Sequence, residues 1–210
     1  MTCLQLALDG SLEDGLNLLR QVHTYVDVVE LGTPLIIREG IGAARRIQRA
    51  FPSMSLLADL KIVDAGEAEA ALAFEAGCRW VTVMGIASDA TVHGAVSAAA
   101  RFGGQVMADL MYVSDTILRG QELLALGCHM LCVHAAYDLQ SSGHKPLGAL
   151  AALRAALPDA PLAVAGGISL DTIQTVMELA PQIVIVGGAI ALADNPATAA
   201  QRLSEQVGAP

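Results

Sequence analysis

The sequence has few aromatic residues, few basic residues and no long apolar run. Aromatic side chains make up only 3% of the 210 residues, although 54% are hydrophobic, so Ala, Val, Leu and Ile must build the interior. Small and branched residues suit the tightly packed layers of an α/β fold. The length fits one domain with a large core or two small ones.

Positive charge is scarce, and it is not clustered. Lys and Arg number 12 against 21 acidic residues, and the net charge of −9 argues against a nucleic-acid partner. An anionic substrate would need a local binding site, since the protein as a whole would not attract it. No apolar run approaches the length of a membrane span, and the chain starts with a strand-like segment. We therefore expect a soluble, cytoplasmic protein with no membrane partner.

The four cysteines lack CxxC spacing, and no secretory signal precedes them, so disulfides are not expected. Cys128 and Cys132 could be imagined with His134 as ligands of a soft metal. Cysteines in apolar, strand-like settings are more often ordinary core residues, and we favour that interpretation.

Strand-like and helix-like segments alternate along the whole chain. The expected strands are Leu4–Asp9, Val26–Leu31, Ser55–Leu60, Trp80–Met84, Gln105–Leu110, Met130–His134, Leu162–Ala165 and Ile183–Val186. The expected helices are Leu12–Val22, Ile37–Ala50, Asp64–Ala76, Ala90–Arg101, Thr116–Leu126, Leu147–Leu157, Ser169–Leu179 and Pro196–Val207. Eight such units without a linker predict a single (β/α)₈ barrel domain, a TIM barrel, over residues 1–210. The alternative is a doubly wound open sheet.

An acid, a lysine and a second acid follow the apolar run that begins at Met54. Side chains alternate along a strand, so Asp59 and Lys61 share a face at the end where parallel α/β folds bind ligands. An ion pair is tolerated there, whereas an unpaired charge is costly. The alternative is a purely structural ion pair, with Asp64 capping the next helix in a capping box with Glu67.

Polar residues stand at the carboxyl ends of most expected strands: Asp9, Glu30, Asp59 with Lys61, Asp109 and His134. Glu30 and Asp59 lie on neighbouring strands and could supply hard oxygen ligands to Mg²⁺. Either acid could instead be hydrogen-bonded to backbone or paired with Lys61. His134 is either a core histidine or an acid/base residue beside Asp138.

The last two strands end in paired glycines, Gly166-Gly167 and Gly187-Gly188. Barrels commonly bind phosphate in the loops after these strands, where glycines let backbone N–H groups approach an anion. Tight turns alone would also explain a glycine pair. Two pairs at these positions favour a phosphate site.

Five motifs are similar to those of the orotidine 5′-phosphate decarboxylase superfamily, and the likeness covers essentially the whole chain. They are ALD at Ala7–Asp9, ELGT at Glu30–Thr33, DLKxxDAG at Asp59–Gly66, AGGI at Ala165–Ile168 and VGGAI at Val186–Ile190. The D-x-K-x-x-D spacing is specific to the superfamily but not to one reaction.

Within the superfamily the chain resembles the 3-hexulose-6-phosphate synthases. The alternative is the 3-keto-L-gulonate-6-phosphate decarboxylases, which have Glu, Thr and Arg where this chain has Asp109, Ala165 and Tyr137. The resemblance implies a lyase, an aldolase of the ribulose monophosphate pathway. It would condense formaldehyde with D-ribulose 5-phosphate to D-arabino-3-hexulose 6-phosphate through a magnesium-stabilised enediolate.

The resemblance also implies a role for each site residue. Glu30 and Asp59 would hold Mg²⁺, Lys61 would stabilise the developing oxyanion, and His134 would move the proton. Substrate hydroxyls would be oriented by Asp9 and Asp109, and the phosphate would be held by backbone near Gly167, Gly188 and Ala189. In this superfamily the site lies at a homodimer interface, so Asp64 would serve the partner's site.

Overall fold

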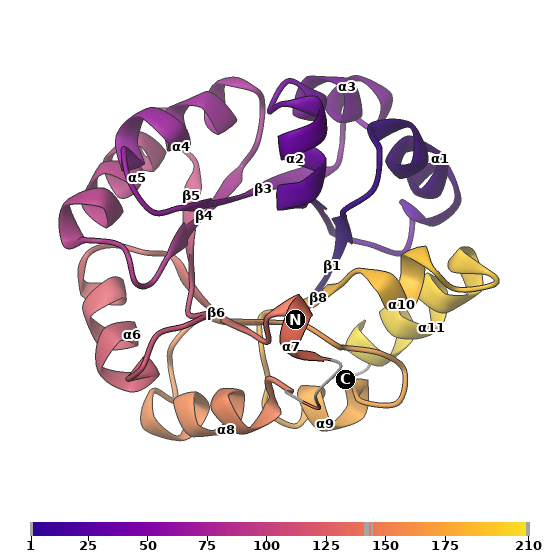
Figure 1. The fold of residues 1–210 in the computed structure, drawn as a ribbon. Coiled ribbons are helices and arrows are strands. Elements are labelled where there is room, and N and C mark those ends of the chain that lie inside the picture. Colours follow the sequence, from indigo (N-terminus) through magenta and orange to yellow (C-terminus); the bar gives the residue numbers. More distant parts are fainter. Residues whose placement is uncertain (1, 141–142, 144, 209–210) are drawn as a thin grey trace.

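Eight short aliphatic strands run parallel and close into a barrel, because β8 pairs with β1 (Figure 1). The structure, a computed structural model, describes residues 2–140, 143 and 145–208. The strands are β1 (Cys3–Leu8), β2 (Val28–Leu31), β3 (Ser55–Ile62), β4 (Trp80–Met84), β5 (Gln105–Asp109), β6 (Met130–His134), β7 (Leu162–Ala165) and β8 (Ile183–Val186). The predicted (β/α)₈ barrel is confirmed, and the open sheet is wrong.

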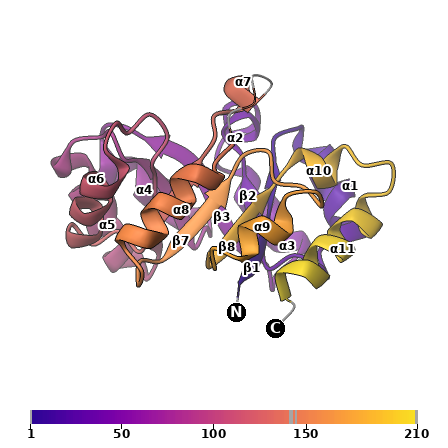
Figure 2. The ribbon, with the colours of Figure 1, turned by 90° about the horizontal axis from the view of Figure 1, so that it is seen from below.

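Helices form the outer layer around the strands (Figure 1). They are α1 (Leu12–Val22), α2 (Thr33–Glu39), α3 (Ala43–Ala50), α4 (Gly66–Glu75), α5 (Asp89–Phe102), α6 (Thr116–Ala125), α7 (Tyr137–Gln140), α8 (Leu147–Ala156), α9 (Ile173–Met177), α10 (Gly188–Ala191) and α11 (Pro196–Gly208). Figure 2 shows α7 projecting at one end of the barrel, opposite the end of α11. Within the described ranges, no helix combines the length and the apolar character needed to cross a membrane.

Two predicted helices differ from the observed ones. The segment expected as one helix over residues 37–50 is split into α2 and α3, because Gly40 ends α2 with a φ of 72°. The helix expected over residues 169–179 is reduced to α9. Its first turn is replaced by a side-chain turn in which the Ser169 amide donates to Thr172 Oγ1.

Apolar side chains fill both faces of the strands. Outward-facing residues pack under the helices, whereas the barrel interior holds a separate cluster that we call the interior plug. The plug consists of Val28, Leu57, Met107, Met130, Cys132, Ala163, Ala165, Ile183 and Ile185. Burying each larger side chain of this kind stabilises the fold by about 1.5 to 3 kcal/mol. The plug also closes the barrel beneath the residues described next.

Helices α4 and α5 approach each other unusually closely. A Cβ atom on Gly66 would lie 1.9 Å from the backbone oxygen of Thr91, so only glycine fits there. Gly66 is the first residue of α4, two positions after Asp64. The close packing therefore fixes the loop that carries Asp64.

A candidate active site at the carboxyl end of the barrel

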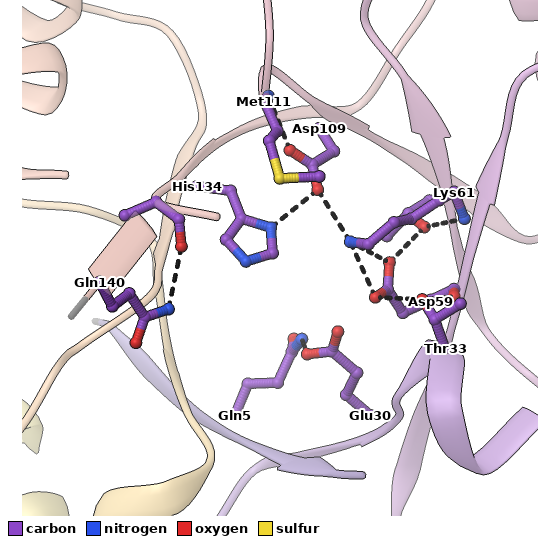
Figure 3. A network of polar contacts seen from close by, with 11 residues as sticks. Gln5, Glu30, Thr33, Asp59, Lys61, Asp109, Met111, His134 and Gln140 are labelled. Atoms are coloured by element: carbon purple, nitrogen blue, oxygen red, sulfur yellow. Dashed lines mark hydrogen bonds and ion pairs between the residues drawn. The ribbon is translucent and has the colours of Figure 1, made fainter. Parts of the chain in front are cut away.

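The alternation of side chains along the strands places polar groups directly above the interior plug. Four polar residues each follow a plug residue by two positions, on the same face of the strand. They are Glu30, Asp59, Asp109 and His134. Figure 3 shows these side chains and that of Lys61 pointing toward one region on the barrel axis. The structure thus brings together five of the residues predicted for the site.

Lys61 forms ion pairs with two carboxylates. Its Nζ atom lies 2.9 Å from Asp59 Oδ2 and 3.1 Å from Asp109 Oδ2. Burial by itself would lower the pKa of the Lys61 ammonium, but the nearby charges of Asp59 and Asp109 outweigh it and raise this pKa. Lys61 therefore stays charged across the physiological range, as electrostatic stabilisation of an anion requires.

Asp109 also holds His134. The ring nitrogen His134 Nδ1 lies 2.8 Å from Asp109 Oδ2, and the Met111 amide donates to Asp109 Oδ1 at 2.9 Å. Burial alone would raise the pKa of Asp109, but the hydrogen bond and charge of His134, with Lys61, lower it. The expected pairing of His134 with Asp138 is wrong, because Asp138 is exposed on α7. The acid was found on the neighbouring strand instead.

Two threonines that the sequence analysis missed hold Asp59. Thr82 donates its hydroxyl to Asp59 Oδ1 at 2.8 Å, and Thr33 Oγ1 lies 2.9 Å from Asp59 Oδ2. Thr82 is the one polar residue in the apolar strand β4, and Thr33 directly follows the end of β2. A lone hydroxyl in a buried strand was the signal that could have found Thr82.

Glu30 is buried, and its hydrogen-bond partner is the amide of Gln5. Gln5 Nε2 donates to Glu30 Oε2 at 2.6 Å, and Gln5 is itself fully buried on β1. Burial first, and then the negative charge of Asp59, raise the pKa of Glu30 to about 8. Gln5 Oε1 is buried without a hydrogen-bond partner in the described part of the chain.

These donors suit a hard divalent cation. Two carboxylates on adjacent strands and an unpartnered amide oxygen are the oxygen groups that Mg²⁺ takes, together with waters and substrate. A cation would also relieve the repulsion that raises the pKa of Glu30. Among the described residues there is no cluster of three or more His, Cys, Asp or Glu that could hold a metal. The set imagined around Cys128, Cys132 and His134 is therefore not formed, and the described cysteines are free.

Asp9 follows β1 at the rim of the barrel and is exposed. Partial desolvation, and then the charge of Asp59, raise the pKa of Asp9. Its side chain packs against Gly32, where a Cβ atom would lie 2.0 Å from Asp9 Oδ1. Its predicted contact with substrate hydroxyls stays a prediction.

The two glycine pairs lie where they were expected, after β7 and β8. Gly166 and Gly167 adopt φ angles of 95° and 69°, which favour glycine. Gly188 begins α10 and has room beside it, since an added Cβ would meet only Leu192 Cδ1 at 3.6 Å. Phosphate binding by Gly167, Gly188 and Ala189 stays a prediction.

Asp64 does not cap α4. The residue before α4 is Ala65, which makes no side-chain cap, and Asp64 Oδ1 accepts a hydrogen bond from the Ala65 amide. Glu67 pairs with Arg101 at 2.7 Å instead of completing a capping box. Asp64 is exposed, and within the described residues it makes no ion pair with the site of its own chain.

Comparison with known proteins assigns this geometry to a family. The orotidine 5′-phosphate decarboxylase / HUMPS family matches residues 2–203. The chain belongs to this family. It is 42% identical over 205 residues to a protein of Bacillus subtilis named 3-hexulose-6-phosphate synthase, covering 97% of this chain and 98% of the relative. A similar protein of Staphylococcus haemolyticus with that name is 39% identical over 205 residues, with the same coverage of both chains.

Solved structures of the family superimpose closely on the barrel. The 3-hexulose-6-phosphate synthase of Salmonella typhimurium is 39% identical, with a TM-score of 0.96 and coverage of 98% of both chains. The structure of KGPDC from Streptococcus mutans in complex with a sugar phosphate is 27% identical, with a TM-score of 0.91 and coverage of 98% of this chain and 97% of that one. The predicted resemblance is confirmed.

Proposed function

We propose that the protein is an aldolase that condenses formaldehyde with D-ribulose 5-phosphate to form D-arabino-3-hexulose 6-phosphate. The observation that carries this proposal is the shared oxygen Asp109 Oδ2, which holds both Lys61 and His134. It sets a cationic group and a proton-transfer group side by side at the carboxyl end of the barrel. Relatives named 3-hexulose-6-phosphate synthase at about 40% identity support the choice of reaction.

His134 is the proposed base. Its Nδ1 atom is engaged by Asp109, which leaves Nε2 to take a proton from C1 of the sugar phosphate. The electron pair left on C1 and C2 forms an enediolate, and C1 then attacks the carbon of formaldehyde. The former aldehyde oxygen takes up a proton, so the sum of the two reactants equals the product.

Lys61 stabilises the negative charge that develops on the enediolate. Its ammonium is fixed by two carboxylates before substrate arrives, so it needs little reorganisation during the reaction. The carboxylates of Asp59 and Asp109 thus position Lys61, and Asp9 at the rim is available to bind a sugar hydroxyl.

Glu30 and Asp59 are the proposed ligands of Mg²⁺, with Gln5 Oε1 beside them. The bound ion would act as a Lewis acid that stabilises negative charge on substrate oxygens. The backbone at Gly167, Gly188 and Ala189 is the proposed phosphate site, since glycine turns and the start of α10 present N–H groups there.

A second copy of the chain is the proposed partner, in a homodimer whose sites are shared. Val63, Ile86 and Tyr112 follow β3, β4 and β5, and each is more than half exposed. Apolar side chains gathered beside a site mark an interaction surface. Asp64 lies next to Val63 and would enter the partner's site. A cytoplasmic location also stays a prediction.

The competing activity is decarboxylation of 3-keto-L-gulonate 6-phosphate, which fits the same barrel. One experiment decides between the two activities. The purified protein is incubated with Mg²⁺ and either D-ribulose 5-phosphate plus formaldehyde or the keto-gulonate phosphate. Formaldehyde consumption and CO₂ release are then measured. We expect rapid loss of formaldehyde and little CO₂. Rapid CO₂ release without formaldehyde loss would establish the decarboxylase.

A further inference from the structure

Thr82 occupies a special position in the pairing of β3 with β4. Ala58 pairs with Val81 and Ile62 with Val83, so three residues of β3 stand opposite Thr82 alone. This bulge places Asp59 and Lys61 on both sides of one hydroxyl group. Thr82 is 4% exposed, so its hydroxyl is shielded from water.

The bulge leaves the backbone of Lys61 in an unfavourable conformation. Lys61 has a φ of 48°, in the left-handed region that a side chain with a Cβ rarely adopts. Its backbone N–H donates to Thr82 Oγ1 at 2.9 Å, which replaces the hydrogen bond that a regular strand would supply. Such strained residues persist only where the surrounding structure fixes them.

The two hydrogen bonds of Thr82 have fixed directions. A backbone N–H can only donate, so the hydroxyl oxygen accepts from Lys61 and its proton goes to the Asp59 carboxylate. One side chain therefore fixes the backbone of the lysine and the carboxylate that pairs with its ammonium. The hydroxyl proton is therefore not available to a ligand.

We propose that Thr82 is a positioning residue that sets Lys61 and Asp59 for catalysis by holding the bulge of β3. The inference rests on the proposed function, because that function makes Lys61 and Asp59 participants in the reaction. A displacement of about 1 Å in a reacting group can cost about 10²-fold in rate. Loss of the hydroxyl is therefore expected to lower kcat by about 10- to 100-fold and to change KM less.

The test compares Thr82→Ser with Thr82→Ala, because both variants lack the threonine methyl group and only the serine retains the hydroxyl. We expect Thr82→Ser to keep kcat within about threefold of the unmodified enzyme, and Thr82→Ala to show the loss. Thr82→Val, which fills the same volume, should behave like the alanine variant. The control is Thr2→Val, which removes another hydroxyl: Thr2 Oγ1 donates to the backbone oxygen of Pro181 at 2.7 Å, directly before β1 and so at the end of the barrel opposite the site. It should lower the melting temperature without lowering kcat.

Hydrogen exchange of the Lys61 amide supplies a readout that does not depend on activity. This amide should be protected in the unmodified protein and in Thr82→Ser, and exposed to exchange in Thr82→Ala. Equal kcat in the serine and alanine variants, or an equal kcat loss in Thr2→Val, would overturn the proposal. The unmodified protein could lack aldolase activity while its Lys61 amide is protected only in variants that keep the hydroxyl at position 82. In that case the assigned reaction is wrong and Thr82 still holds the bulge.

Discussion

His134 Nδ1 and Asp109 Oδ2 lie 2.8 Å apart, and the same oxygen lies 3.1 Å from the ammonium of Lys61. Asp109 thereby fixes the tautomer and orientation of the histidine while it neutralises part of the lysine charge. The two groups proposed for catalysis are thus held by a single buried carboxylate.

Asp109→Asn should lower kcat by about 10²- to 10³-fold and change KM less, because the neutral amide would not stabilise the positive charge that His134 acquires when it takes the proton. Steady-state kinetics with D-ribulose 5-phosphate and formaldehyde would measure this effect. Asp115→Asn is the control, since Asp115 caps α6 at the surface and Asn caps a helix equally well. An unaltered kcat in Asp109→Asn would exclude the proposed role.

Removal of divalent cations should abolish turnover, and added Mg²⁺ should restore it, because Glu30 and Asp59 are the proposed ligands. Glu30→Gln should raise the Mg²⁺ concentration needed for half-maximal activity steeply. Titration with Mn²⁺, followed by electron paramagnetic resonance, would measure metal binding without turnover. Full activity in thoroughly chelated enzyme would contradict this assignment.

The stability of the metal-free protein should decrease as the pH rises through neutrality. Glu30 has its pKa raised from 4.5 to about 8 in the folded state, so the folded chain retains a proton that the unfolded chain has lost. The free energy of unfolding therefore falls as the pH rises from the unfolded-state pKa to the folded-state pKa, and it levels off above the latter. In the presence of EDTA, the unmodified protein should lose unfolding free energy on the order of 1 kcal/mol or more as the pH rises, and Glu30→Gln should not show this loss.

Urea unfolding at pH 5.5 and pH 8.5 would measure the difference for both proteins. Glu39→Gln is the control, because Glu39 is exposed on α2 and away from the barrel interior. The same loss of stability in Glu30→Gln as in the unmodified protein would show that another group is responsible.

Gly188→Val should raise KM for the phosphorylated sugar strongly and leave the fold intact. The new side chain has room, since a Cβ would meet only Leu192, but it would cover the N–H groups proposed to bind phosphate. Gly148→Val, on the exposed start of α8 with open space around it, is the matched control. Ribulose without phosphate should be a very poor substrate. An unchanged KM in Gly188→Val would remove the phosphate assignment.

Lys61→Ala and Asp64→Ala should each be nearly inactive, and a refolded mixture of the two should recover activity. In a mixed dimer one site carries both defects, and the other site has Lys61 and Asp64 intact. Random pairing predicts about a quarter of the full activity, because half of the dimers are mixed and each has one intact site. If mixed dimers form and stay inactive, Asp64 acts within its own chain.

The sequence was sufficient to predict the barrel and most of the residues around its axis. Strand alternation placed Glu30, Asp59 and Asp109 correctly, because the inward or outward direction of a side chain follows from its position within its own strand. The partner of His134 was missed, since it depends on the stagger between β5 and β6. The bulge at Lys61 was also missed, because alternation assumes a regular strand and a local register shift leaves no pattern in sequence.

The interior plug gives the bottom of the site a low dielectric constant. The charged residues lie at the carboxyl end of the barrel, and beneath them the apolar side chains of Leu57, Met107 and Ile185 cannot screen charge. Salt screens exposed charges more strongly than buried ones. Added salt should therefore ease the approach of a phosphate ester to a chain of net charge −9, while leaving the attraction between Lys61 and Asp109 almost unchanged.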